Sequence, residues 1–350
     1  MDPEPAPTRV SLRDIAARLG VSHVTVSLAL RDAPRVSIAL RNKIKMAANE
    51  MGYRPDPMLQ ALAAYRRRKS TPAIHSALAW INAWPRAEDL RSHKEFDLYW
   101  KGASEGAVKL GYRLEEFRLD RQLTAQRLHR IFRARGIRGI LLPPHGSLQP
   151  DWRDFPWEEY SVVRFGRTLK EPQAHLVTAD QFTNTLLAVN KMRERGYQRI
   201  GLIARGISHD PRGPQFIGGF LSAREQLNDV QPLPIFRFEE RVNRDVVASF
   251  RSWIDKEKPD ALLSAVGHRE LLHEAGYHVP DDFPVAVTSI LDGGADSGVD
   301  QHPEEIGRVG MLMLNSLICD GARGIPAIFR QILVEGSWVD GSSLPDRRNG

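Results

Sequence analysis

The stretch Val10–Leu30, VSLRDIAARLGVSHVTVSLAL, decides how the first part of this chain folds. Its first half has apolar residues at i, i+3, i+4 and i+7, the spacing of one buried helical face. These residues are Leu12, Ile15, Ala16 and Leu19. Gly20 follows, and glycine tolerates the positive φ at which many helices end. The pattern therefore predicts a first helix that stops at Gly20.

A second, short helix is predicted over His23–Leu30. Ser22 can cap it, because a serine hydroxyl accepts a free backbone N–H of the first turn. We expect this helix to bury Val26 and either Ala29 or Leu30. Its other face carries small polar groups: His23, Thr25 and Ser27. Two helices around a glycine-containing turn are typical of a helix-turn-helix, whose second helix enters the major groove of DNA. The alternative is an ordinary helical hairpin within a core.

The distribution of charge favours the DNA-binding interpretation. Residues 1–69 contain 13 Lys and Arg against 6 Asp and Glu, a net charge of +7. The remaining residues contain 36 against 37 and are close to neutral. A local basic excess is the electrostatic signature of nucleic-acid binding, and here it coincides with the motif.

The overall composition is that of a globular protein with two or three domains in 350 residues. There is no apolar run of about 18 residues, so no membrane span is expected. The first ten residues, MDPEPAPTRV, lack the apolar core of a signal peptide, which predicts a cytoplasmic, nucleoid-associated protein. Cys319 is the single cysteine, which excludes an internal disulfide and a thiol-rich metal site. Its apolar surroundings predict a buried structural thiol, and we expect no cofactor.

Three helices are predicted to form a small DNA-binding domain over residues 1–57. The third spans about Ile38–Met51, with Ser37 as its cap, and ends at Gly52. The prolines of Tyr53–Pro57 prevent its continuation. Residues 58–72 are predicted to be a hinge helix and linker, because a helix over Met58–Tyr65 is too short to be stable alone.

From Ala73 onward, short apolar runs alternate with longer amphipathic runs, which predicts parallel β-sheets with helical crossovers. The predicted strands are Ser76–Ile81, Arg113–Phe117, Gly139–Leu142, Ser161–Phe165, Leu176–Thr178, Arg199–Ala204, Pro234–Phe238, Ala261–Ala265 and Val285–Ile290. The predicted helices are Phe96–Leu110, Ala125–Arg135, Phe182–Arg195, Gln215–Asn228, Arg244–Lys256, Arg269–Ala275 and Glu304–Cys319. About nine strands suit two sheets with a cleft at the carboxyl ends of their strands. We place the passage between the sheets at Lys170–Gln173.

This order of elements resembles the lactose-repressor (LacI) family of bacterial transcription regulators. The residues that carry the resemblance are Leu12–Ala16, Gly20–Ser22, Thr25–Ser27, Val36-Ser37, Met51–Pro57 and Leu62. Looser landmarks follow in the family's order: Lys109–Tyr112, Gly136–Leu142, Arg195–Leu202, Gly219-Phe220, Pro259–Ala261, Gly276–Asp282 and Gln301–Arg308. The resemblance implies an N-terminal all-α helix-turn-helix domain and a two-lobed α/β domain like that of periplasmic binding proteins.

The resemblance also implies a homodimer that reads a pseudo-palindromic operator in double-stranded DNA. The hinge would fold to a helix on DNA and press Leu62 into the minor groove, where an apolar wedge kinks the duplex. By position, the major-groove readers are His23, Val24, Ser27 and Leu28. Phosphate-contacting or positioning residues are Ser11, Leu12, Ser22, Thr25 and Tyr53. Such phosphate contacts set register, whereas base contacts set sequence.

Three positions depart from the family's DNA-binding pattern. Leu28 stands where arginine is common, so discrimination there must be apolar, for example through a thymine methyl. Arg31 replaces a common asparagine and can take a phosphate. Leu59 is bulkier than the alanine usual in that turn of the hinge. The operator is therefore expected to differ from those of typical members.

Family members mostly bind sugars or other small metabolites between the lobes. The residues that could reach such a cleft are Asn82, Trp84, Phe96, Tyr99, His145, Arg164, Arg212, Gln215, Asp292 and Gln301. Each is equally consistent with a surface loop. The polar pair expected after Ala261–Ala265 is absent, Ser289 replaces a common aspartate, and Phe216 replaces a common arginine. A carbohydrate-type effector is expected, but these losses favour a more aromatic or acidic ligand, or a partly degenerate pocket.

The effector-binding and dimerisation domain is expected over residues 73–343. Lobe one would hold about 73–171 and 303–330, and lobe two about 174–300 with the C-terminal strand. Residues 344–350 are expected to be a disordered tail, and the absence of a leucine-heptad tail favours a dimer over a tail-built tetramer.

Three other functions are alternatives to an effector-controlled repressor. An enzyme lacks motif support, since no Gly-rich phosphate loop, HExxH or GxSxG occurs. A solute-binding protein would share the two-lobed fold but need a secretion signal and no DNA-binding arm. A regulator with a degenerate pocket and no effector is the remaining alternative.

Overall fold

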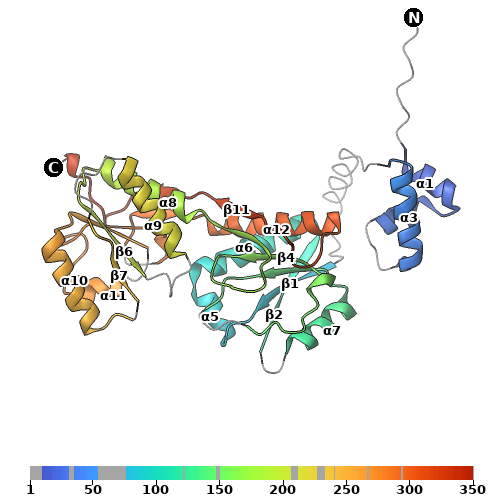
Figure 1. Ribbon diagram of the computed structural model, residues 1–350, viewed down its shortest axis with the longest axis horizontal. Helices are drawn as coiled ribbons and strands as arrows, with labels where there is room; N and C mark the ends of the chain where they lie inside the picture. Colours follow the sequence, from blue (N-terminus) through green and yellow to red (C-terminus); the bar gives the residue numbers. More distant parts are fainter. Residues whose placement is uncertain are drawn as a thin grey trace, which may run out of the picture.

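The structure of the chain is a computed structural model. It describes residues 10–30, 35–53, 76–120, 123–146, 150–205, 212–226, 233–239, 241–265, 268–292 and 295–349. Figure 1 shows the order of the helices and strands along the chain.

The N-terminal unit consists of three short helices around a small apolar core. They are α1 (Leu12–Leu19), α2 (His23–Leu30) and α3 (Ile38–Glu50). Gly20 ends α1 with a φ of 63°, the left-handed conformation that glycine adopts without a steric cost. The core residues, each less than a tenth exposed, are Ile15, Ala16, Val26, Ala29, Val36, Ile44, Ala47 and Ala48. The predicted helix-turn-helix and its buried face are therefore present.

Lobe one is built on a six-stranded parallel sheet with the strand order β11-β5-β4-β3-β1-β2. Its strands are β1 (Ser76–Asn82), β2 (Tyr112–Arg118), β3 (Gly139–Leu142), β4 (Ser161–Phe165), β5 (His175–Ala179) and β11 (Gln331–Val334). Its helices are α5 (Ala87–Ser92), α6 (Lys94–Leu110), α7 (Ala125–Arg135) and α12 (Pro303–Asp320), with a 3₁₀ turn η1 (Trp157–Glu159).

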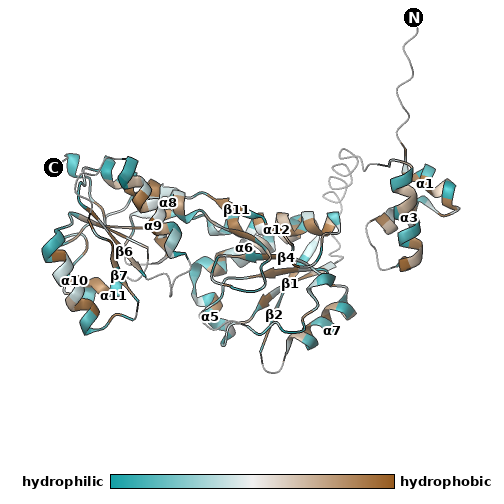
Figure 2. Ribbon diagram, viewed as in Figure 1, coloured by the Kyte–Doolittle hydropathy of each residue, from teal (hydrophilic) through white to brown (hydrophobic). Residues whose placement is uncertain are grey.

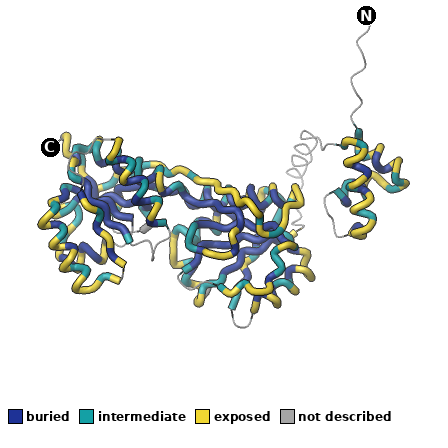
Figure 3. Tube along the Cα trace, in the orientation of Figure 1, coloured by how far each residue is buried: buried dark blue, intermediate teal, exposed yellow. Residues whose placement is uncertain are grey.

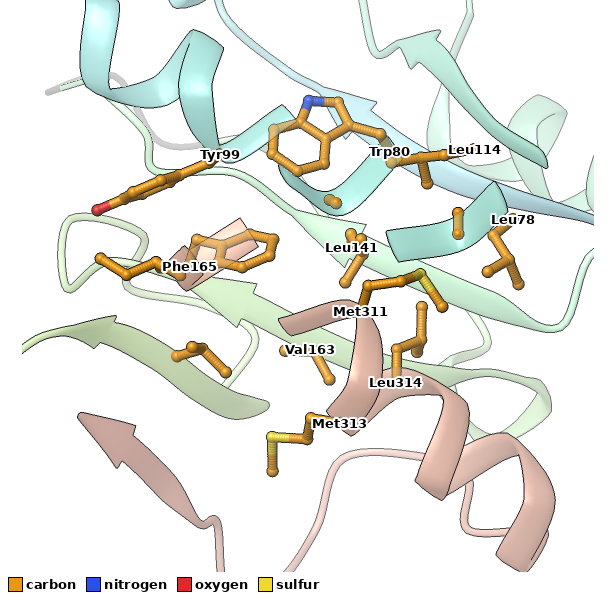
Figure 4. Close-up of a cluster of buried hydrophobic side chains, with 14 of the residues drawn as sticks. Leu78, Trp80, Tyr99, Leu114, Leu141, Val163, Phe165, Met311, Met313 and Leu314 are labelled. Carbon is orange, nitrogen blue, oxygen red and sulfur yellow. The ribbon is translucent and has the colours of Figure 1, made fainter. Parts of the chain in front are cut away.

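The helices of lobe one cover both faces of its sheet. α6 and α12 pack on one face, where Trp80, Tyr99, Phe165 and Met311 meet in a continuous core (Figure 4). α7 packs on the other face through Leu128 and Phe132. Because both faces are covered, the inner strands β1, β3, β4 and β5 are mainly apolar (Figure 2), as is typical of parallel sheets.

Lobe two has a six-stranded sheet with the order β12-β10-β9-β8-β6-β7, in which β12 runs antiparallel to β10. Its strands are β6 (Ile200–Arg205), β7 (Phe236–Phe238), β8 (Ala261–Ser264), β9 (Val285–Val287), β10 (Gly298–Asp300) and β12 (Ser337–Val339). α8 (Gln181–Glu194) and α9 (Gly213–Gln226) cover one face. α10 (Arg244–Glu257) and α11 (His268–Glu274) cover the other. Two 3₁₀ turns, η2 (Ile290–Asp292) and η3 (Arg347–Asn349), complete the lobe.

The chain passes between the lobes at three places, each at the carboxyl end of a strand. β5 leads into α8 through Asp180, β10 leads into α12 through Gln301 and His302, and β11 leads into β12 through Glu335 and Gly336. The carboxyl ends of both parallel sheets therefore border the region where these passages lie, which is where open α/β sheets bind ligands.

The first of these passages corrects the sequence-based expectation. Lys170–Gln173 does not lead out of lobe one, because β5 pairs with β4 and β11 in the first sheet. The loop is folded back by the buried Arg164, whose guanidinium donates to the carbonyl oxygens of Leu169 at 2.5 Å and Ala174 at 3.3 Å. The predicted end of lobe one at residue 171 thus falls before β5, which belongs to this lobe. β11, which lies beyond residue 330, also belongs to it.

Two further expectations differ from the structure. Cys319 is exposed on α12, since the buried stripe of that helix runs through Leu314 and Leu317 instead. Residues 344–349, expected to be disordered, pack on lobe two. Leu344 is 1 % exposed within the core, and the Tyr197 hydroxyl donates to the carbonyl oxygen of Pro345 at 2.7 Å.

Candidate DNA-reading face and ligand cleft

The N-terminal half of α2 presents side chains to solvent. His23 is exposed and Val24 has 52 % of its surface exposed, whereas Val26 and Ala29 are completely buried on the opposite side. A short helix with one face fixed in a core and the other bare has the geometry of a recognition helix. These two residues are the most accessible of the predicted base readers.

Two serine caps fix the ends of the helices that border this face. The Ser22 hydroxyl accepts a hydrogen bond from the backbone N–H of Thr25 at 3.0 Å, which starts α2. Ser11 starts α1, and its backbone N–H and hydroxyl both donate to the Asp14 carboxylate, at 2.7 and 2.8 Å. The backbone hydrogen bond from Ser11 is the main reason that the pKa of Asp14 is lowered. To bind a DNA phosphate as predicted, Ser11 would have to give up its hydrogen bonds to the Asp14 carboxylate.

The other predicted DNA-binding residues have more restricted positions. Leu12, Leu28 and Tyr53 are partly buried and pack against the small core. Thr25 and Ser27 are half-buried. The predictions for Arg31, Leu59 and Leu62 fall outside the described residues.

In lobe one, the structure brings four of the predicted effector residues together. Trp84 stacks on His145 with ring centroids 5.8 Å apart and lies 6.4 Å from Phe96, which lies 6.0 Å from Tyr99. The Trp84 indole N–H donates to the carbonyl oxygen of Pro144 at 3.0 Å and fixes the ring. We call these four residues the aromatic wall; they follow β1 and β3 or lie in the first turns of α6.

Tyr99 is the residue of the aromatic wall on which a charge from lobe two acts. Its hydroxyl donates to Glu95 at 2.9 Å. Burial is the main cause that raises its pKa well above the usual range, the Glu95 charge adds to the rise, and the positive charge of Arg212 opposes it. Arg212 precedes α9, and its carbonyl oxygen accepts from the backbone N–H of Gln215 at 3.0 Å. The charge of Arg212 therefore acts on the Tyr99 side of the aromatic wall, and Gln215 follows it in the first turn of α9.

Three predicted effector residues are used elsewhere or remain undescribed. Asn82 is completely buried, donates to Glu116 at 2.7 Å and accepts from the backbone N–H of Trp84 at 3.1 Å. It holds the loop that carries Trp84. Arg164 holds the loop described above, and its pKa is lowered first by burial and then by Arg167. Asp292 ends η2, and its side chain lies outside the described parts.

Apart from Gln215 and Gln301, which were predicted, sequence reasoning missed a group of buried polar residues in lobe two. Ser264 ends β8 and Thr288 follows β9; the Thr288 N–H donates to the Ser264 carbonyl oxygen at 3.0 Å, but neither hydroxyl has a hydrogen-bond partner. Gln301, which was predicted, donates to the Thr288 carbonyl oxygen at 2.6 Å. Near the amino ends of α8 and α9, the side-chain atoms without a partner are Gln181 Oε1, Asn184 Nδ2 and Gln215 Oε1.

Buried polar atoms without a partner are rare, and each costs free energy until something bonds to it. These five atoms lie at strand ends or early in helices, on the side of lobe two where the passages to lobe one lie. We call them the unpartnered set. The position of Ser264 and Thr288 at the ends of otherwise apolar strands was the one signal in the sequence that could have identified them.

A separate cavity of about 1110 Å³ opens in lobe one beyond β1 and β2. It is lined by Trp84, Arg118, Asp120, Thr124, Asp151 and Arg153, among others. Only Trp84 belongs to the predicted effector residues, and Arg118 and Arg153 already bind Asp120 and Asp151. This cavity therefore shares Trp84 with the aromatic wall and none of the wall's other residues.

Among the described residues, no group of three His, Cys, Asp or Glu side chains could hold a metal ion. No described helix is long and apolar enough to cross a membrane.

Two family profiles match the chain. "Bacterial regulatory proteins, lacI family" matches residues 11–56, and "Periplasmic binding protein-like domain" matches residues 189–344. The repressor CytR of Escherichia coli K12 is 26 % identical over 342 residues, which cover 88 % of this chain and 89 % of that protein. The ribose operon repressor of Bacillus subtilis is 24 % identical, with 79 % and 80 % covered.

Solved structures share the fold at lower identity. A complex of the transcriptional regulator CelR with cellobiose has a TM-score of 0.55 and 22 % identity, with 96 % of this chain and all of that chain covered. The lac repressor dimer bound to operator and the anti-inducer ONPF has a TM-score of 0.52 and 18 % identity, with 97 % and 100 % covered.

The helix-turn-helix domain and the two-lobed α/β domain together define the class of this protein, a DNA-binding transcriptional regulator whose larger part has the fold of periplasmic binding proteins. Its relatives in these comparisons are regulators and repressors. The chain thus has a helix-turn-helix domain of the LacI family of bacterial regulatory proteins and a periplasmic-binding-protein-like domain, and it is similar to LacI-type repressors along most of its length.

Proposed function

We propose that this protein is a repressor that binds a pseudo-palindromic operator as a homodimer, with one α2 helix in each half-site. The bare face at His23 and Val24, within the basic segment of the chain, is the observation that carries this proposal. Ser22 and Thr25 would hold the helix against phosphates, and Leu62 would act as the minor-groove wedge. The protein would act in the cytoplasm, associated with the nucleoid, and have no catalytic activity.

We also infer that a small carbohydrate-type effector binds between the lobes. Three features support this site: the aromatic wall of lobe one, the charge of Arg212 that acts on Tyr99, and the unpartnered set of lobe two, which includes Gln215. An aromatic ring packs well on the apolar face of a sugar or another flat ring, whereas unpartnered amides and hydroxyls recognise its polar edge. CelR was solved with cellobiose, which shows that this fold accommodates a sugar.

Selection of binding sites from genomic fragments, followed by fluorescence anisotropy at fixed salt, tests the proposal. We expect an enriched sequence with two inverted half-sites, bound about a thousandfold or more tighter than scrambled DNA of the same length. Addition of neutral sugars, sugar acids and nucleosides then tests for an effector. Enrichment without symmetry, or none, would overturn the operator proposal, while enrichment that no small molecule alters would favour a regulator with a degenerate pocket.

A further inference from the structure

A run of large apolar side chains lies exposed along one edge of lobe one. Ile325, Ile328, Phe329, Ile332 and Leu333 are all between 36 % and 85 % exposed, with Ile328 the most. They lie in β11 and in the segment that leads to it, which Figure 3 shows as exposed over most of its length. Adjacent exposed apolar residues on a sheet edge are typical of an interaction surface.

The hydrogen-bonding groups of this edge are also open. β11 is the last strand of its sheet, parallel to β5. The carbonyl oxygens of Arg330 and Val334 accept from the backbone N–H groups of Leu176 and Asp180 at 3.0 and 2.9 Å. In a parallel ladder alternate residues face the same neighbour. Gln331, Leu333 and Glu335 therefore direct their N–H and C=O groups away from β5.

The opposite edge of the same sheet is protected. β2 carries four charged residues, Arg113, Glu115, Glu116 and Arg118, and Glu115 binds Arg135 at 2.6 Å. Charged side chains on an edge strand discourage pairing with another chain. The four residues of β11, QILV, contain no charge and no proline, so this edge lacks such protection.

The side chains of β11 are complementary to a second copy of themselves. When two β11 strands pair antiparallel about a twofold axis at Leu333, Leu333 meets its counterpart, Ile332 meets Val334, and Gln331 meets Glu335. The Gln331 amide oxygen already accepts from Arg167 at 2.9 Å. The Gln331 amide N–H can then donate to the incoming Glu335 carboxylate, and Arg167 adds a positive charge beside it.

We propose that β11 is an interface at which two copies of this chain join their lobe-one sheets edge to edge. The contact is separate from the pairing of the recognition helices, because it lies in β11 and uses no residue of the N-terminal domain. It would let one assembly hold more than one pair of recognition helices.

The test is the mass of the full-length protein in solution, measured by light scattering during gel filtration. Leu333→Lys places a charge at the twofold axis, and we expect it to halve the mass of the wild-type assembly. Leu221→Lys is the matched control, because Leu221 is similarly exposed, at 46 %, on α9. We expect it to keep the wild-type mass. Equal masses for Leu333→Lys and the wild type would overturn the proposal.

A charge exchange tests the register. Glu335→Lys brings a cation towards Arg167 of the second copy and should dissociate the assembly, and Gln331→Glu added to it should restore the mass. A double variant that stays dissociated would overturn this pairing, and so would capture of a different protein by β11 in place of a second copy. Operator binding by Leu333→Lys, measured alongside, separates failure of this interface from failure of the proposed DNA-binding function.

Discussion

At the scale of residues, two buried threonines of lobe two differ in whether their hydroxyls are hydrogen-bonded. Thr288 and Thr185 are both completely buried. The Thr185 hydroxyl donates to the Gln181 carbonyl oxygen at 2.7 Å, whereas the Thr288 hydroxyl has no partner. An unpartnered buried hydroxyl destabilises the free protein, and a ligand that bonds to it recovers that free energy.

Replacement of each threonine by the isosteric valine should therefore have opposite effects. Thr288→Val should raise the free energy of unfolding by about 1 kcal/mol, and Thr185→Val should lower it by about the same amount. Each change corresponds to a shift of roughly 2 °C in Tm for a domain of this size. The measurement is thermal unfolding without ligand; a Tm that falls in both variants would mean that Thr288 is not held ready for a ligand.

Asp296 predicts a pH dependence of stability. Its carboxylate accepts from the Ser343 N–H at 2.7 Å and the Ser342 hydroxyl at 2.9 Å, which ties the C-terminal segment to lobe two. Backbone hydrogen bonds from Ser342 and Ser343 are the main reason that its pKa lies well below the usual 3.8. A folded-state pKa below the unfolded value means that the stabilisation is complete above pH 3.8 and is lost as the pH falls through the folded value.

Asp296→Asn should therefore destabilise the protein by about 1 kcal/mol near neutral pH, after allowance for solvent screening. The gap between variant and wild type should shrink as the pH falls below 3.8. Urea unfolding midpoints over a pH series measure the gap. A gap that is constant with pH would show that the ionised carboxylate is not the stabilising group.

At the scale of elements, the serine cap of α2 links stability to DNA reading. Ser22→Ala removes the acceptor for the Thr25 N–H and should cost about 1 kcal/mol of helix stability. Because the recognition helix has only eight residues, we expect its first turn to loosen and operator affinity to fall severalfold. Far-UV circular dichroism and anisotropy measure the two effects, and Ser252→Ala, at an exposed serine on α10 that caps no helix, is the control. Unchanged operator affinity in Ser22→Ala would show that the Ser22 cap does not contribute to DNA binding.

Elements with a clear pattern of apolar residues were predictable from the sequence, and short or exposed strands were not. Gly139–Leu142, Ser161–Phe165 and Ala125–Arg135 are found with the predicted bounds, because each is a clear apolar run or amphipathic helix. β10 and β12 have three residues each, and β11 is exposed. Such strands exist through pairing with distant partners, which no local pattern records.

The candidate ligand site was predictable in part for the same reason. Trp84, Phe96, Tyr99 and His145 follow strands or begin a helix, so the topology alone suggested that they meet. Arg164 shares such a position but turns into the loop after β4. Thr288 and Ser264 could be suspected only from their places at the ends of apolar strands, and only the tertiary structure shows that their hydroxyls lack partners.

At the scale of the whole molecule, the chain combines a DNA-reading unit with a two-lobed unit whose strand ends converge on three passages. Both sheets contribute to the region around these passages, the aromatic wall from lobe one and the unpartnered set from lobe two. A ligand that bonds to both would favour one arrangement of the lobes over another, and only such a difference in affinity lets a ligand shift an equilibrium. The central claim, however, is that α2 selects the DNA sequence.

The most direct test is the ratio of dissociation constants for the selected operator and scrambled DNA, measured at one salt concentration for the full-length protein. Joint replacement of His23→Ala and Val24→Ala should lower this ratio by about tenfold or more, since each lost base contact costs about 1–3 kcal/mol. Met46→Ala is the control, because Met46 is 63 % exposed on α3, outside the predicted reading face. A ratio that stays at the wild-type value in the double variant would contradict the assignment of α2 as the helix that reads the operator.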